Sequence, residues 1–352
     1  MFERFVHRAA GPQQNFLSSF SVIMETLEET ELCFPQLINS SCRKQKRSDT
    51  EAVLVYILLS SISLLTATLN LLVIISIAHF KQLHTPTNLL LLSLAVSDFF
   101  VGLLMSSQIL LSGGCWFLSD HMCTLYGVLD YIITSASVGT MVLISVDRYV
   151  AICDPLHYPN KVTVRGVTIC TCLCWVCSVL YNSFIMKENF TQPGRYNSCS
   201  GECVVVINYI AGVADVILTF IGPVSVIIVL YMRVFVVAVS QARAMRSHIA
   251  ALTHQRSETL LTKKSEIKAA RTLGVVVVVF LTCLCPYYCS SFVSQHTLFG
   301  VASVPLEIWL FYFNSCLNPV IYAFCYPWFL NSIKLIVTFK ILQPDSCETS
   351  IL

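Results

Sequence analysis

Charged residues are scarce in this chain. Asp, Glu, Lys and Arg make up 12% of its 352 residues, whereas hydrophobic residues make up 55%. A soluble globular domain usually carries about 25% charged residues, so a chain this apolar is expected to need lipid to cover its surface. The net charge of +2 gives no electrostatic reason to expect a nucleic-acid partner. Internal repeats and low-complexity tracts are also lacking, which favours one domain built within a membrane.

Long polar stretches are few, and they separate seven apolar windows. About 20 apolar residues cross the ~30 Å hydrocarbon core of a bilayer. Windows of this kind cover residues 52–78, 88–111, 122–150, 167–186, 204–238, 269–294 and 304–326. The stretch after Tyr326-Pro327-Trp328-Phe329, up to Lys340, is amphipathic and is predicted to lie along the membrane surface. The sequence therefore predicts an all-α membrane protein, a seven-transmembrane helix bundle with a short amphipathic helix eight.

Lys and Arg are rare in the connectors after the second, fourth and sixth helices, where only Lys187 and Arg195 occur. They are frequent in the other connectors, so the positive-inside rule places the N-terminus outside, although a basic run precedes the first helix. Two N-glycosylation sequons, at Asn39 and Asn189, fall outside in the same topology. We expect a multi-pass plasma-membrane protein with an extracellular segment 1–50, a transmembrane domain 51–326, and helix eight with a cytoplasmic tail at 327–352.

Seventeen cysteines would suggest a disulfide scaffold in a small secreted protein. Eleven of them fall in the predicted helices or on the inner side, where they act as small apolar residues kept reduced. An even number remains outside, and spacing alone does not decide how they pair. We expect full pairing, in preference to one bridge and four free thiols, among Cys33, Cys42, Cys115, Cys123, Cys199 and Cys203.

Three carboxylates stand out within the apolar windows: Asp98, Asp130 and Asp215. A carboxylate in a membrane helix is costly, so such residues usually face the bundle interior and serve function. Asp130 lies about 10 Å below Cys123 along the third helix, and Asp215 lies at comparable depth in the fifth. No Lys or Arg occurs in the outer half of any predicted helix. A cation from solvent, most simply an organic amine, is therefore the expected partner.

Aromatic residues complete this candidate amine site in the outer halves of the third, sixth and seventh helices. Aromatic faces attract cations by roughly 0.5–2 kcal/mol. The alternatives are that Asp130 binds water or a backbone group, that Asp215 is hydrated, and that individual aromatic rings only pack. Besides the two carboxylates, the candidate ligand-binding residues are Tyr131, Thr134, Tyr287, Tyr288, Trp309 and Tyr312.

One motif in each helix resembles the rhodopsin-like G-protein-coupled receptors, over about residues 50–335. The third helix ends in Asp147-Arg148-Tyr149, and the seventh ends in Asn318-Pro319-Val320-Ile321-Tyr322. The other helices contribute, in order, Asn70, Asp98, Trp175, Pro223 and Pro286. This resemblance implies a receptor, not an enzyme, with a small-molecule ligand outside and a heterotrimeric G protein inside.

Within that class the chain resembles the trace amine-associated receptors, and among them fish-type olfactory members with a second Asp in helix five. Tyr326-Pro327-Trp328-Phe329 after the last helix and Cys115-Trp116 before the third carry this resemblance. It implies a receptor for extracellular amines that acts through a stimulatory G protein and raises cyclic AMP. Diamines or polyamines as odorants are the implied ligands, because Asp215 matches the second carboxylate of members that take them.

The resemblance also assigns roles at matching positions. Asp130 is the implied amine-binding carboxylate. The implied disulfides are Cys123–Cys203, Cys33–Cys199 and Cys42–Cys115. An allosteric sodium ion, which favours the inactive state, is implied at Asp98, Ser137, Asn314 and Asn318, the alternative being a polar core filled by water. No other cofactor is expected.

An activation mechanism follows from the same resemblance. Arg148 would pair with Asp147 and, across the bundle, with Glu266, so that the sixth helix is restrained until an agonist shifts the equilibrium. The implied activation and G-protein residues are Asp147, Arg148, Tyr149, Leu156, Tyr231, Glu266, Phe280, Asn318, Pro319 and Tyr322. Leu284 departs from the family pattern, which usually has Trp there, and leaves Phe280 to carry the packing switch.

Other classes are disfavoured by what the sequence lacks. A retinal-binding pump needs a Schiff-base lysine in the last helix, and residues 304–326 contain none. A transporter would show inverted repeats or broken helices at the membrane midplane. The remaining alternatives are a neurotransmitter receptor for an amine such as serotonin or histamine, and an orphaned receptor whose amine site has decayed.

Overall fold

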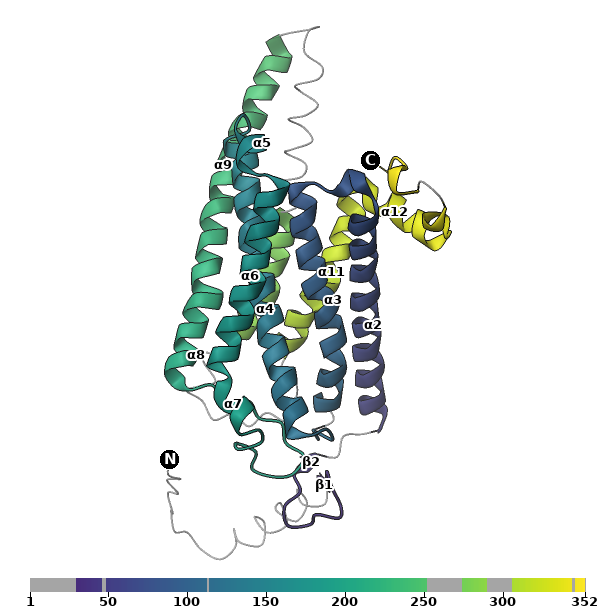
Figure 1. The fold of residues 1–352 in the computed structure, drawn as a ribbon, viewed down its shortest axis with the longest axis vertical. Coiled ribbons are helices and arrows are strands. Elements are labelled where there is room, and N and C mark those ends of the chain that lie inside the picture. Colours follow the sequence, from purple (N-terminus) through teal and green to yellow (C-terminus); the bar gives the residue numbers. More distant parts are fainter. Residues whose placement is uncertain are drawn as a thin grey trace, which may run out of the picture.

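The computed structural model describes residues 30–45, 49–112, 114–251, 274–289, 306–343 and 346–351. Most of them form long helices that run side by side (Figure 1). The first four are α2 (Asp49–His79), α3 (Pro86–Ser112), α4 (Asp120–Cys153) and α6 (Val164–Ile185). The fifth combines α8 (Tyr209–Asp215), a π-helical turn η2 (Val216–Ile221) and α9 (Gly222–Ala251).

These five helices are each long and apolar enough to cross a membrane. Two more apolar helices complete the series, Gly274–Cys289 and α11 (Leu306–Cys325). A bend of 98° then leads into α12 (Pro327–Val337), the amphipathic helix that the sequence predicts after the bundle. The all-α seven-helix architecture is therefore confirmed, together with its eighth helix.

The fifth apolar window was placed too early in the sequence analysis. Residues 204–207 are not helical in the structure, and the helix begins only at Tyr209, where Asn208 has extended backbone and its side chain accepts a hydrogen bond from the amide of Ala211. Val204, Val205, Val206 and Ile207 are β-branched, which favours extended backbone over helix. Their apolar character has another use, because two of them line the central cavity described below.

Short elements connect the helices at their two ends. At one end lie η1 (Lys81–Leu83), α5 (Tyr158–Lys161) and α12, and we call it the Arg148 end (Figure 1). At the other lie α7 (Lys187–Thr191) and the antiparallel strands β1 (Thr30–Leu32) and β2 (Arg43–Gln45), and we call it the hairpin end.

Packing and polar contacts both hold the helices together. Helix α3 packs between α2 and α4, α4 also contacts α6 and α9, and α11 lies against α2 and α3. Hydrogen bonds between side chains and neighbouring helices add to this packing. Asn70 Nδ2 on α2 donates to the Ser315 carbonyl on α11 over 3.0 Å. Trp175 Nε1 on α6 donates to Ser93 Oγ on α3 over 3.1 Å. The outward faces of α2, α6 and α9 expose many large apolar side chains, as expected of surfaces covered by lipid.

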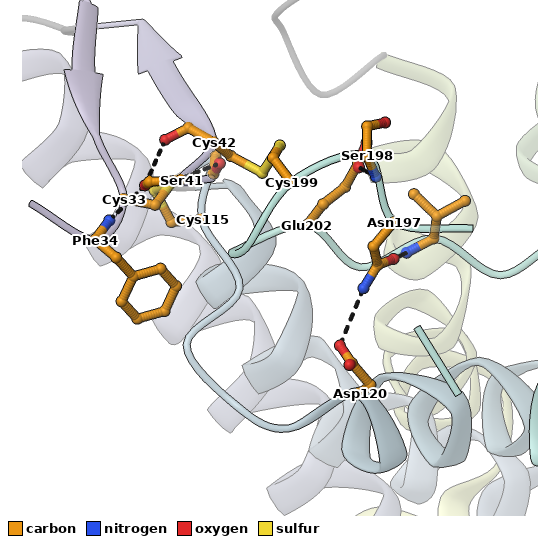
Figure 2. Close-up of a disulfide and its surroundings, with 12 residues drawn as sticks. Cys33, Phe34, Ser41, Cys42, Cys115, Asp120, Asn197, Ser198, Cys199 and Glu202 are labelled. Carbon is orange, nitrogen blue, oxygen red and sulfur yellow. Dashed lines mark hydrogen bonds between the residues drawn. A yellow bond between two sulfur atoms is a disulfide. The ribbon is translucent and has the colours of Figure 1, made fainter. Parts of the chain in front are cut away.

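Three disulfides cross-link the hairpin end. Cys123–Cys203 is present as expected, but the other two pairings implied by the family resemblance are wrong: Cys33 bonds to Cys115, and Cys42 bonds to Cys199 (Figure 2). The reason is a β-bridge between Ser41 and Ser200, which sets Cys42 directly beside Cys199. Cys33 bonds instead to Cys115, in the segment before α4. Their Cα atoms are 5.6 Å apart, which is an ordinary separation for a disulfide.

The C-terminal residues fold back onto the Arg148 end. The Lys81 ammonium group donates a 3.0 Å hydrogen bond to the Glu348 carboxylate, and Asn331 Nδ2 on α12 donates to the Ile351 carbonyl over 3.1 Å. The Ile351 side chain is buried in the main apolar core, whose members include Phe80. Residues 346–351 thus join the turn after α2 to α12.

Candidate functional site

A cavity of about 250 Å³ lies between α4, α8, η2, the helix Gly274–Cys289 and α11. Both Asp130 and Asp215 line it, on opposite elements of its wall. Four of the sequence-predicted residues also line it, namely Tyr131, Thr134, Tyr287 and Tyr288. The structure thus brings two carboxylates from distant parts of the chain to one cavity rich in aromatic rings.

Asp130 is oriented by a pair of tyrosine hydroxyl groups. The Tyr312 hydroxyl on α11 donates a hydrogen bond to Asp130 Oδ1 over 3.4 Å, and the Tyr126 and Tyr312 hydroxyl oxygens are 3.1 Å apart. Among the described residues, no Lys, Arg or His forms an ion pair with Asp130. The Asp130 carboxyl group therefore lines the cavity without a basic partner from the described part of the chain.

Asp215 ends α8 and is followed at once by the π-helical turn η2. Single π-turns often occur at functional sites, because they change the direction in which the neighbouring side chains point. Asp215 is buried, with an exposed fraction of 8%, and the Tyr181 hydroxyl on α6 lies beside its carboxyl group. Its Oδ1 atom has no partner at hydrogen-bond distance within the described part of the chain. A buried carboxylate oxygen of this kind favours a ligand that donates to it.

Aromatic rings that contact one another line part of the cavity. The Tyr288 ring lies parallel to that of Phe220 with centroids 4.3 Å apart, and Tyr287 contacts both Tyr288 and Phe311. Phe311 lines the cavity although it was not predicted. Trp309, which was predicted, does not line it. It packs instead in a cluster with Tyr312 and Met105, because two residues along a helix turn the side chain to a different face.

Several wall residues were not predicted from the sequence. Val205 and Ile207 come from the extended segment before α8, Asn182 from α6 and Thr219 from η2. The apolar β-branched run at residues 204–207 could have indicated that these residues line the cavity. Because the run precedes the fifth helix, its side chains cannot belong to the lipid-facing side of that helix. Asn182 offers no comparable signal in the sequence.

The two sequons differ sharply in the structure. Asn39 is exposed in the loop between β1 and β2, where a glycan can be attached. Asn189 is buried, with an exposed fraction of 4%, and its side-chain amide both donates to the Val206 carbonyl and accepts from the Val206 amide. The Asn189 Nδ2 atom, to which an N-glycan would be attached, is thus engaged with the Val206 carbonyl.

A second polar site lies deeper in the bundle around Asp98. The Ser315 hydroxyl donates to Asp98 Oδ1 and Asn318 Nδ2 donates to Asp98 Oδ2, each over 2.7 Å. Ser315 was not predicted, whereas Asn318 was. Asn314 on α11 and Ser137 on α4 are also buried, and within the described residues neither side chain is hydrogen-bonded to Asp98. The Oδ1 atoms of Asn314 and Asn318 have no partner among the described residues, which suits oxygen ligation of a cation.

At the opposite end of α4, Arg148 is held by buried oxygen atoms. Its guanidinium forms an ion pair of 2.6 Å with Asp147 and also donates to Thr87 Oγ1 over 2.6 Å. The Tyr158 hydroxyl on α5 donates to the other Asp147 oxygen over 2.8 Å. Asp147 and Arg148 are therefore paired as predicted, and Thr87 and Tyr158 extend the network to α3 and α5.

Comparison with known proteins agrees with this arrangement. Residues 69–322 match the 7 transmembrane receptor (rhodopsin family). Trace amine-associated receptor 13c of Danio rerio is 36% identical over 92% of this chain and 97% of its own length. Trace amine-associated receptor 9 of Homo sapiens is 38% identical over 92% of this chain and 95% of its length. Trace amine-associated receptor 8a of Rattus norvegicus is 37% identical over 91% and 96%, respectively. The chain belongs to the trace amine-associated receptors.

Membership of the trace amine-associated receptors settles the class of the protein as a multi-pass membrane receptor and not an enzyme. Several residues that the family resemblance implies in activation are described by the structure. Leu156 is 87% exposed at the Arg148 end, whereas Tyr322, Phe280 and Leu284 are buried in the main core. The Tyr231 and Tyr322 hydroxyl groups have no hydrogen-bond partner within the described ranges. Glu266 lies outside the described residues.

Proposed function

We propose that this trace amine-associated receptor detects extracellular diamines or polyamines at the plasma membrane, with its N-terminus and hairpin end outside. One ammonium group pairs with Asp130 and a second with Asp215. The alkyl linker between them crosses the side chains of Tyr131, Thr134, Tyr287 and Tyr288. The cationic nitrogen atoms thereby neutralise both carboxylates of the cavity.

The observation that carries this proposal is the placement of two acidic side chains on one cavity without a basic side chain beside them in the described part of the chain. Burying a lone charge is costly unless the charge is paired and hydrogen-bonded. A ligand with two separated positive charges supplies both partners at once. A monoamine supplies one partner and leaves the other carboxylate hydrated.

Aromatic rings support the amine class independently. Tyr131, Tyr287, Tyr288 and Phe311 surround the space between the carboxylates. Their faces attract cations by roughly 0.5–2 kcal/mol each, and their apolar edges suit an alkyl linker. The relatives are named for trace amines, which points to the same ligand class.

We further propose that the receptor signals through a stimulatory G protein and raises cyclic AMP, as an olfactory sensor. Agonist binding releases Arg148 from Asp147, and Tyr231 and Tyr322 then close behind it. Leu156 is exposed beside this network and enters the G protein. A sodium ion held by Asp98, Asn314 and Asn318, with Ser137, favours the inactive state. Each of these steps shifts a two-state equilibrium by differential binding.

The test is a cyclic AMP assay in cells given monoamines and α,ω-diamines of rising chain length. The wild-type receptor should respond to diamines of one preferred length at lower concentration than to any monoamine. Asp130→Asn should abolish every response, and Asp215→Asn should remove only the preference for diamines. Glu188→Gln is the matched control, because Glu188 is an exposed acid at the same end outside the cavity. Equal potency of both ligand classes on the wild-type receptor would defeat the diamine proposal and leave a monoamine receptor.

A further inference from the structure

The Asn189 side chain pairs with the backbone of Val206 in the way that a neighbouring β-strand would. Val206 belongs to the segment that precedes α8. Asn189 Nδ2 donates to the Val206 carbonyl over 2.8 Å, and its Oδ1 accepts from the Val206 amide over 3.2 Å. Both backbone groups of Val206 are thereby satisfied by a single side chain. Thr124 Oγ1 on α4 in turn donates to the Asn189 carbonyl over 3.3 Å, which fixes Asn189 itself.

The pairing of the Val206 backbone with Asn189 sets the direction of the neighbouring Val205 and Ile207 side chains. The exposure of Val205, Val206 and Ile207 alternates, as it does along extended backbone, so Val205 and Ile207 lie on the side opposite to Val206. The Val206 side chain is exposed, whereas Val205 and Ile207 line the cavity that holds Asp130 and Asp215. These two residues also pack against Val128, Ile132 and Met186.

The position of this wall leaves little room for movement toward α4. A Cβ atom on Gly127 would lie 2.9 Å from Val205 Cγ2, so the two elements are already in contact. The Cys123–Cys203 disulfide fixes the segment three residues before Val206. Beyond that bridge, Asn189 supplies the side-chain contact that holds the backbone at Val206.

We infer that Asn189 is a positioning residue of the amine cavity and not a glycosylation site. It holds the backbone of Val206 so that Val205 and Ile207 form one wall, and this wall sets the length of amine that fits between Asp130 and Asp215. The inference rests on the proposed function for its ligand, but the contact itself can be tested without ligand. An N-glycan is attached through Nδ2, the atom that bonds to Val206, so the wall and a glycan at Asn189 exclude each other.

The first experiment counts glycans on the receptor. Peptide N-glycosidase should reduce the mass of the wild-type chain, and Asn39→Gln should remove that shift entirely. Thr191→Ala destroys the sequon while leaving the Asn189 side chain in place, because the Thr191 hydroxyl donates to the Glu188 carbonyl and, among the described residues, has no bond to Asn189. It should migrate like the wild type. A residual shift in Asn39→Gln that Thr191→Ala removes would overturn the inference.

The second experiment tests the wall without ligand, by hydrogen exchange of the full-length receptor in detergent or nanodiscs. In the wild type and in Thr191→Ala, the Val206 amide should be protected. Asn189→Ala should abolish that protection, and Asn189→Asp, which keeps the accepting Oδ1, should retain part of it. Unchanged protection in Asn189→Ala would overturn the inference whatever ligand the receptor takes.

The third experiment measures which diamine length gives the strongest cyclic AMP response, at matched surface expression. Asn189→Ala should lower the potency of the preferred diamine roughly tenfold and broaden or shift the preferred length, since two hydrogen bonds are lost. Thr191→Ala should leave both unchanged. In a Val205→Ala background, Asn189→Ala should add little further change, because both act on the same wall. A uniform loss of potency with the length preference intact would show a merely structural role and contradict the inference.

A second variant covers the case in which Asn189→Ala fails to reach the surface. Gly127→Ala pushes on Val205 from α4 and should shift the length preference without touching Asn189. An unchanged preference in Gly127→Ala would contradict the wall as the determinant of length. Should no amine of the panel activate the wild-type receptor, the proposed function fails, while the glycan count and the exchange of the Val206 amide still decide the inference.

Discussion

The hydroxyl group of Tyr312 on α11 donates a hydrogen bond to Asp130 Oδ1 on α4 over 3.4 Å. The contact joins two helices that are distant in sequence at the carboxylate proposed to bind the amine. It holds Asp130 in one orientation toward the cavity, and Tyr126 contacts the Tyr312 hydroxyl in turn. The first prediction tests this orientation.

Tyr312→Phe should reduce the potency of monoamines and diamines by the same factor, roughly fivefold. The distance of 3.4 Å is long for a hydrogen bond, so the loss corresponds to about 1 kcal/mol. Cyclic AMP concentration–response curves measure it, with Tyr196→Phe, which lies outside the cavity, as the control. A loss confined to diamines would show that Tyr312 serves Asp215 and not Asp130.

The second prediction concerns the loop that presents Leu156. The Tyr158 hydroxyl bonds to Asp147, and Leu156 is exposed two residues earlier. Tyr158→Phe removes this anchor and should lower the maximal agonist-stimulated cyclic AMP several-fold, while ligand potency changes little. Leu156→Ala should give the same phenotype, and the double variant should be no worse than either alone. Full additivity of the two effects would contradict a shared mechanism.

The third prediction concerns the docked C-terminal residues. The Glu348 carboxylate accepts a hydrogen bond from Lys81 and raises the pKa of the Lys81 ammonium group above its ordinary value of 10.5. A raised amine pKa means that the pair is complete below that pH and is lost only as the pH rises beyond it. Docking should therefore be insensitive to pH near neutrality but should weaken in high salt, because the pair is exposed.

Hydrogen exchange of residues 346–351 measures that docking. Ile351→Ser should speed the exchange strongly, since a buried apolar side chain is lost, whereas Lys81→Ala should speed it weakly. The double exchange Lys81→Glu with Glu348→Lys should restore the protection. Equal effects of Ile351→Ser and Lys81→Ala would show that the ion pair, and not the apolar contact, holds the segment.

The fourth prediction tests the cation site at Asp98. Replacing potassium by sodium at constant ionic strength should lower agonist potency on the wild-type receptor, because the ion stabilises the inactive state. Asp98→Asn should remove this sodium effect. Ser315→Ala removes one of the two donors to Asp98 and should alter the sodium dependence without abolishing it. A wild-type receptor that responds equally in both salts has no such site.

The helices and the two carboxylates of the cavity could be predicted from the sequence for physical reasons. Seven apolar windows leave little choice of fold in a bilayer, and a carboxylate such as Asp130 or Asp215 inside a helix is too costly to be accidental. Tyr287 and Tyr288 could be predicted with them, because the depth of a residue in a helix follows from its distance to the helix end. The depth of a residue in the membrane depends only on its position within its own helix, so it can be predicted without knowing how the helices pack.

Two other properties could not be predicted in the same way. One is the direction in which a side chain points from its helix, and the other is contact between segments that are distant in sequence. Trp309 and Phe311 are two residues apart, and only the packing of α11 shows that Phe311 faces the cavity. The Cys42–Cys199 bond depends on the bridge between Ser41 and Ser200, which no spacing rule specifies. Asn189 matched a sequon, but its burial depends on a segment that is distant along the chain.

A structure of the receptor with its most potent diamine bound, determined by cryo-electron microscopy, is the most direct test of the central claim. One ligand nitrogen should lie within hydrogen-bond distance, about 3 Å, of an Asp130 oxygen, and the other within the same distance of an Asp215 oxygen. A second nitrogen placed elsewhere, with Asp215 bonded to a protein group, would contradict the account.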